Sequence, residues 1–131
     1  MSLNNNIQNA LTTQLNTVSG LPIIAYANSG FEPANGVDFV RPTLIPAKSE
    51  LFALEIGRHH GIYQVDLYTA LNKGTAPLLL LADSIRDKFL TQRRLTSDTD
   101  VIFIQEISIS PAQRVEGWWS CYVEINYMCF N

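Results

Sequence analysis

Two adjacent histidines, His59 and His60, are the residues of this chain best suited by type to chemistry. Imidazoles serve as metal ligands, or as a general base in a hydrolytic or small-molecule site. In an extended segment the two side chains point to opposite faces and cannot easily bind one metal ion. Since no HxH or HExxH spacing supplies a further ligand, we predict no metal site. A small-molecule-binding or hydrolytic domain centred on His59 and His60 is kept as the alternative of another class.

The sequence patterns of nucleophilic and nucleotide-binding sites are absent. The chain has no GxSxG elbow, no GxxxxGK[ST] loop and no GxGxxG fingerprint. Asp83 and Asp87 are four residues apart with Arg86 between them, which is typical of a solvated helix face. We therefore expect no catalytic residues, no cofactor and no enzyme activity.

The two cysteines, Cys121 and Cys129, lie in one strand-like run, WWSCYVEINYMCF. Eight residues of extended chain separate them by roughly 26 Å, which is far beyond the reach of a disulfide. Their even spacing places both on one strand face. Buried free thiols that pack as small hydrophobes are the favoured interpretation.

The composition predicts one soluble domain that spans residues 1–131. Hydrophobic residues make up 47% and charged residues only 16%, which leaves uncharged surface for a partner. A net charge of −3 argues against sequence-specific nucleic-acid binding, although DNA could still pass by the protein. No apolar run approaches the length of about 18 residues that marks a membrane helix. The polar start is unlike a signal peptide, so a cytosolic location is expected.

The N-terminal half predicts one helix and two strands. Apolar residues at helical spacing indicate a helix over 5–18, and Gly20 followed by Pro22 marks its end. Strands are expected at 22–27 and 37–45, and Phe31 in the loop between them is expected to anchor that loop on the core. Pro42 cannot donate a ladder hydrogen bond, so the second strand should lie at an edge or carry a bulge. Residues 46–58 should form a connection with a short extended piece.

The stretch 61–89 is the best-specified unit of the chain. A strand over 60–69 alternates, with Tyr63, Val65 and Leu67 on its core face. Thr75 is a good N-cap for the helix that follows. This helix should bury Leu78, Leu81, Ala82, Ile85 and Phe89, and present Asp83, Arg86, Asp87 and Arg93 on its opposite side.

Leu79 and Leu80 widen the apolar arc at the start of this helix. A deeper local core would explain them, and burial against a neighbouring subunit is the functional alternative. The final strands, 101–110 and 118–129, raise the same question. One face of the last strand is core, and the other carries Trp118, Tyr122 and Met128, types that are enriched at interfaces. The candidate subunit interface is therefore Leu79, Leu80, Trp118, Tyr122 and Met128.

Short motifs along nearly the whole chain resemble the small tail-terminator and minor tail proteins of long-tailed phages and prophages. The resemblance rests on Asn28, Phe31, Pro33 and Gly36; Phe39-Val40-Arg41; Gly61 with Gln64-Val65; Gly74; Leu81-Ala82-Asp83 with Phe89; and the Trp-to-Tyr final strand. The two histidines and the 46–58 connection have no counterpart in this pattern.

The resemblance implies a structural protein of the virion tail that is assembled in the cytoplasm of the bacterial host. Members form a homo-oligomeric, hexameric ring on the finished tail tube, stop its growth and present a surface to the head. The implied partners are the chain itself, the tail tube protein and a head-completion or connector protein, with DNA passing through the ring. No catalytic residues are carried over. A head–tail connector, which also forms rings, is the nearest alternative.

The predicted fold is a single α+β domain in the order α-β-β-β-α-β-β. Two helices should pack on one face of a mixed or mostly antiparallel sheet of about five strands.

Overall fold

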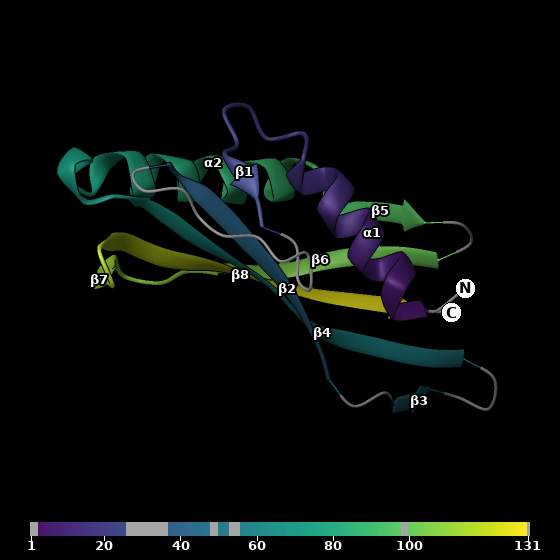
Figure 1. Cartoon of the computed structure of the whole chain (residues 1–131). Helices are drawn as coiled ribbons and strands as arrows, with labels where there is room; N and C mark the ends of the chain where they lie inside the picture. The colour runs from purple at the N-terminus through teal and green to yellow at the C-terminus, as the bar shows by residue number, and fades with distance from the viewer. Residues whose placement is uncertain (1–2, 26–36, 48–49, 53–55, 98–99, 131) are drawn as a thin grey trace.

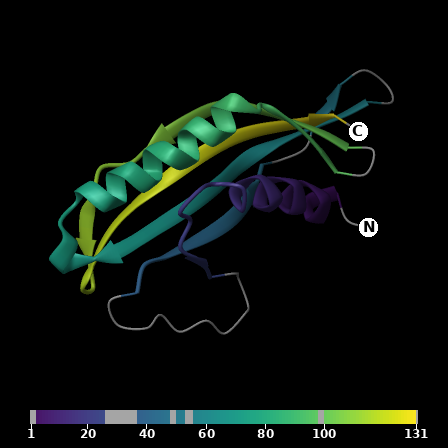
Figure 2. The same cartoon turned by 90° about the horizontal axis from the view of Figure 1, so that it is seen from above.

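The computed structural model describes residues 3–25, 37–47, 50–52, 56–97 and 100–130. Two helices lie beside one long, curled sheet (Figures 1 and 2). The helices are α1 (Leu3–Leu15) and α2 (Ala76–Thr91), and a single 3-10 turn (Leu71–Lys73) leads into α2. The strands are β1 (Ile23–Ile24), β2 (Phe39–Pro46), β3 (Glu50–Phe52), β4 (Ile56–Ala70), β5 (Arg94–Ser97), β6 (Asp100–Ile109), β7 (Gln113–Val115) and β8 (Trp118–Phe130).

The sheet has the strand order β1-β2-β4-β8-β6-β5, with β3 paired to β4 and β7 to β8. Only the β1–β2 pair is parallel among these pairings. The long strands β4 and β8 pair along almost their whole length, from Arg58 opposite Phe130 to Ala70 opposite Trp118. This pair is the centre of the fold (Figure 1).

The core lies between the helices and one face of the sheet, which we call the inner face. In β4 and β8 the buried residues alternate with half-buried ones, as strands covered on one side require. Both helices contribute to the same buried cluster. Its main members are Ile7, Leu11 and Leu15 of α1; Leu78, Ala82, Ile85 and Phe89 of α2; Tyr63, Val65 and Leu67 of β4; and Cys121, Val123, Ile125 and Tyr127 of β8.

The predicted α+β class, the mixed sheet and the packing of both helices on one face are confirmed. The expected strand number is too low, because β5 and β7 were not predicted. The short extended piece expected within 46–58 is present as β3, and β4 begins in the same stretch, at Ile56. Strands of three or four residues carry too little alternation to stand out in a sequence, and pairing with a long neighbour is what fixes them. The predicted anchoring role of Phe31 lies outside the described residues.

The residues expected to mark the ends of the helices behave as predicted, with two exceptions. Gly20 adopts the expected left-handed conformation, with φ at 76°. Thr75 occupies the N-cap of α2, but its side chain makes no capping hydrogen bond. Arg93 does not belong to the polar face of α2, since the helix ends at Thr91.

Both cysteines are buried free thiols on the inner face, as predicted. Burial raises the pKa of Cys121 from 9.0 to about 11, and nearby Asp66 adds to this. Burial likewise raises the pKa of Cys129 from 9.0 to about 11, with Asp100 adding to it. Burial also raises the pKa of Tyr127 from 10.0 to about 12.

These shifts predict a fold that weakens in alkali. All three groups hold their protons more tightly in the folded than in the unfolded chain. The contribution of the two cysteines is therefore complete below about pH 9 and is lost as the pH rises through 11, and that of Tyr127 is lost between about pH 10 and 12. Urea unfolding should give a constant free energy at pH 7–8 and a falling one above pH 9. The double variant Cys121→Ala/Cys129→Ala should show a shallower fall, and an equally steep fall would contradict this account.

Candidate assembly surfaces

The outward side of α2 exposes apolar side chains. Leu80 is 67% exposed and Leu79 42% exposed, whereas their neighbour Leu78 is fully buried. The interpretation of Leu79 and Leu80 as a deeper local core is therefore wrong. Successive helical residues are about 100° apart, so Leu78 can face the sheet only if the next two residues turn away from it. We call Leu79 and Leu80 the α2 patch.

Charged residues continue this side of α2 beyond the patch. Arg86 lies 3.4 Å from a carboxylate oxygen of Asp83 and 3.4 Å from one of Asp87. All three side chains are substantially exposed, which confirms the predicted solvated face. The α2 patch is thus an apolar area beside charged residues. This arrangement matches a protein contact in which an apolar centre is bordered by a polar rim.

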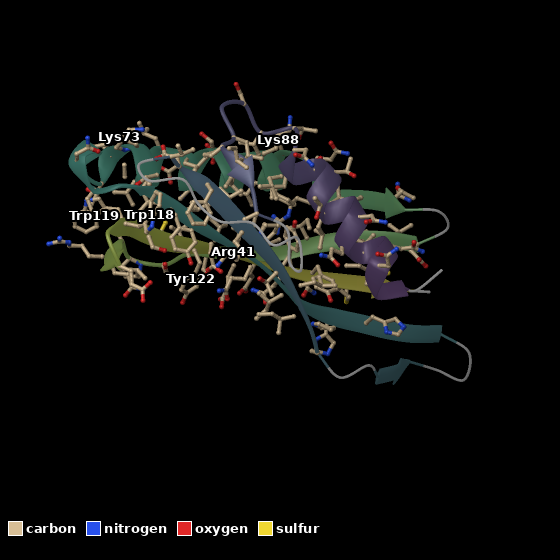
Figure 3. All side chains as sticks on the ribbon, in the orientation of Figure 1. Arg41, Lys73, Lys88, Trp118, Trp119 and Tyr122 are labelled. Carbon is tan, nitrogen blue, oxygen red and sulfur yellow. The ribbon has the colours of Figure 1, made fainter. Side chains whose placement is uncertain are left out.

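The sheet face that points away from both helices forms a second surface, which we call the outer face (Figure 3). Cross-strand partners define it row by row. Phe39, Tyr68 and Ser120 form one row, Arg41, Asp66 and Tyr122 the next, and Thr43, Gln64 and Glu124 a third. Ile45, Ile62 and Asn126 follow, and then His60, Met128 and Phe103. In Figure 3 Arg41 and Tyr122 lie on this side, whereas Lys73 and Lys88 lie beside α2.

Three aromatic rings pack together at one end of the outer face. The rings of Phe39 and Tyr68 stack with centroids 4.5 Å apart, and Trp118 meets Phe39 edge-on at 5.2 Å. The guanidinium of Arg41 lies 5.7 Å from the Phe39 centroid, within cation–π range. Phe39 is only 3% exposed. The three rings therefore form a packed aromatic cluster at this end of the face.

An acidic residue lies in the middle of the row that adjoins the cluster. Partial burial raises the pKa of Asp66, while the Gln64 side-chain hydrogen bond of 3.0 Å and the charge of Arg41 act to lower it. Arg41→Ala removes one of the two opposing influences. We expect the pKa of Asp66 to rise further in this variant, as measured by NMR titration of its carboxyl carbon. Arg41→Lys keeps the charge and is the matched control; equal pKa values in both variants and the wild type would contradict the assignment.

The five predicted interface residues do not form one patch. Leu79 and Leu80 lie on α2, while Trp118, Tyr122 and Met128 lie on the outer face of β8. Along β8, Tyr122 and Met128 are roughly 13 Å and 33 Å from Trp118. At the far end, the Met128 sulfur accepts a 3.7 Å hydrogen bond from Gln105. The structure thus places the candidates on two surfaces, on opposite sides of the inner-face core.

Sequence reasoning missed the part that β2 has in the outer face. Phe39, Arg41, Thr43 and Ile45 recur at every second position and share that face. This alternation is visible in the sequence, but the proline in the middle of the strand drew the interpretation toward its edge instead.

The two histidines are half-buried near the start of β4, with His59 opposite Cys129 and His60 opposite Met128. As adjacent strand residues they point to opposite faces, as the sequence predicted. Among the described residues, no group of three His, Cys, Asp or Glu side chains could hold a metal ion. One groove lies between α1 and β5, and another lies between α2 and the residues that follow α1. Neither histidine lines either of these two grooves.

No helix in the described part of the chain is long and apolar enough to cross a membrane.

Comparison with known proteins identifies a family. The sequence model of a family described as phage tail terminator protein matches residues 6–127. None of the curated proteins matches the sequence. A solved structure matches with a TM-score of 0.78 and 19% identity, covering 98% of this chain and 96% of that chain. At such low identity this last likeness establishes the fold alone.

Proposed function

Because the chain belongs to the phage tail terminator family, we propose that it ends the growth of the tail tube by binding the finished tube as a ring. The ring then presents a surface to the incoming head. The family is a structural one, and membership makes this chain a component of tail assembly rather than an enzyme. The hydrolytic alternative centred on His59 and His60 has no support from it.

The observation that carries the proposal is the family match over residues 6–127, taken with the two separate surfaces. A ring is closed by a heterologous contact, in which one patch of a subunit meets a different patch of the next. The α2 patch and the outer face are two such patches on one chain. Each single contact can be weak, because six copies around a ring bind a tube through many contacts at once.

The partners follow from this arrangement. The chain binds further copies of itself, in a ring that we expect to be a hexamer, and the tail tube protein below it. A head-completion or connector protein binds the opposite side. A net charge of −3 suits a ring through which DNA passes without being held.

Tube growth in vitro tests the proposal. Purified tail tube protein is allowed to polymerise with and without this chain, and tube lengths are measured by negative-stain electron microscopy. We expect shorter tubes, with added density at one end, once the chain is present in slight excess over tube ends. Tubes of unchanged length with bare ends would overturn the proposal.

A further inference from the structure

Among the described residues, the outer edge of β2 lacks most of the backbone donors that strand addition needs. In a strand, successive residues direct their N–H and C=O groups to alternate edges. The Ala25 N–H donates to the Val40 carbonyl at 2.7 Å, so even-numbered residues of β2 face the outer edge. The Ala47 N–H donates to the His60 carbonyl, which confirms that odd residues face β4.

Two prolines occupy that edge. Because β1 covers only Phe39 and Val40, the outward positions beyond it are Pro42, Leu44 and Pro46. Proline has no N–H, so Leu44 carries the one outward donor of this stretch. Pro42 stands where the next bond of the parallel β1 ladder would form. The sequence predicted an edge or a bulge at Pro42. The pairing of β1 with β2 shows in addition that Pro42 lies at the outward position where a longer β1 would need a backbone donor.

The opposite edge is closed by an arginine and by short strands. β5 covers the first residues of β6 and is itself only four residues long. Immediately before β5 begins, the Arg93 carbonyl accepts a 2.8 Å hydrogen bond from the Ile104 N–H. The Arg93 guanidinium then donates to the carbonyls of Ile104 and Gln105, at the bulge in β6.

Beyond the bulge, little of that edge remains open. The Ser110 N–H points to β8, where it donates to the Tyr122 carbonyl. Ile107 and Ile109 are therefore the outward residues that follow, and the next outward position is Pro111. A strand added here would find two adjacent outward donors, and one added along β2 would find a single donor.

We propose that Pro42, Pro46 and Arg93 disfavour strand addition along β2 and along β6, the two sides of the sheet on which these residues lie. A second copy of this chain therefore contacts side chains, such as those of the α2 patch or the outer face, and does not continue the sheet. Natural sheets use prolines, charged residues and short edge strands to prevent edge-to-edge association. This advantage rests on the proposed function: in a chain that ends tail tubes, edges of this kind suppress open-ended growth before the tube is reached.

Restoring the missing donors tests this inference on the isolated chain, so its outcome is independent of the tube-growth experiment. Pro42→Thr/Pro46→Thr gives β2 three consecutive outward donors. Self-association, followed by sedimentation velocity and thioflavin fluorescence, should appear at about tenfold lower protein concentration than in the wild type. Pro22→Thr, which removes a proline ahead of β1, is the matched control and should behave as the wild type. Equal association of all three proteins would overturn the proposal.

Two further experiments test the inference even if the double variant Pro42→Thr/Pro46→Thr does not fold. Pro46 is exposed, so Pro46→Thr alone should fold and should still lower the association concentration. In the wild type, hydrogen exchange should be fast at the Leu44, Ile107 and Ile109 amides at low and at high concentration. Protection of these amides that grows with concentration would show strand addition and would refute the inference.

Discussion

Gly61→Val is expected to abolish the native fold. Gly61 lies on β4 where three groups close over it. A Cβ atom added there would lie 2.5 Å from the Ile45 carbonyl oxygen, 2.7 Å from the Tyr127 hydroxyl and 2.9 Å from Pro46 Cα. Two of these three groups are backbone of the paired strand, so they cannot move without breaking the β2–β4 ladder. Glycine is therefore the residue that fits here without a shift of the β2 backbone.

The milder change Gly61→Ala gives the measurable quantity. Overpacking of a core by one methyl group costs roughly 1–3 kcal/mol, and a backbone contact places this site at the upper end. Urea unfolding followed by circular dichroism should show that loss. Gly20→Asn is the control, because a Cβ atom added at Gly20 would meet no other described residue within 4 Å, chain neighbours aside, and asparagine tolerates the positive φ of this position. If Gly61→Ala lowers the free energy of unfolding no more than Gly20→Asn does, the close packing of β2 and Tyr127 against Gly61 is wrong.

Leu80→Asp is expected to leave the subunit folded and to abolish assembly. Leu80 is mostly exposed, and exposed substitutions change the free energy of unfolding by at most about 0.5 kcal/mol. In an assembled ring the same side chain would be buried against a neighbour, where an unpaired carboxylate carries a large desolvation cost. We expect the yield of infectious particles in a complementation assay to fall at least about 100-fold, the effect of losing a central contact residue.

Leu90→Asp is the matched control for this prediction. Leu90 is 42% exposed and lies near the other end of α2, outside the α2 patch. It should complement at the wild-type level, and both variants should melt at the wild-type temperature. Normal complementation by Leu80→Asp, or an equal loss in both variants, would remove the α2 patch from the interface.

The long elements of this fold could be predicted from the sequence because their patterns are strong. The alternation around Tyr63, Val65 and Leu67 determines which face of β4 is buried, and the spacing of Leu78, Ala82, Ile85 and Phe89 does the same for α2. The short strands β5 and β7 could not be predicted, since they exist through pairing with β6 and β8. The same limit applied to Arg93, because its guanidinium contacts carbonyls at a bulge that lies 11 and 12 residues further along the chain.

The candidate surfaces were harder to predict than the core. Trp118, Tyr122 and Met128 were recognised as unusual for a solvent face, and they do share the outer face. Their separation along β8, and the stacking of Phe39 on Tyr68, depend on which strands lie side by side. A sequence shows the type of each residue on a face, but strand order decides which of them touch.

The length of tails made without this protein tests the central claim most directly. The gene is deleted from its phage, lysates are examined by electron microscopy, and the distribution of tail lengths is compared with that of the wild type and of a complemented strain. A terminator predicts tails of irregular, often excessive length that lack heads, and a normal distribution once the protein is supplied. A connector would leave tails of normal length that fail to join heads. Tails of normal length in the deletion, whether or not they carry heads, would contradict the proposal that this chain ends tube growth.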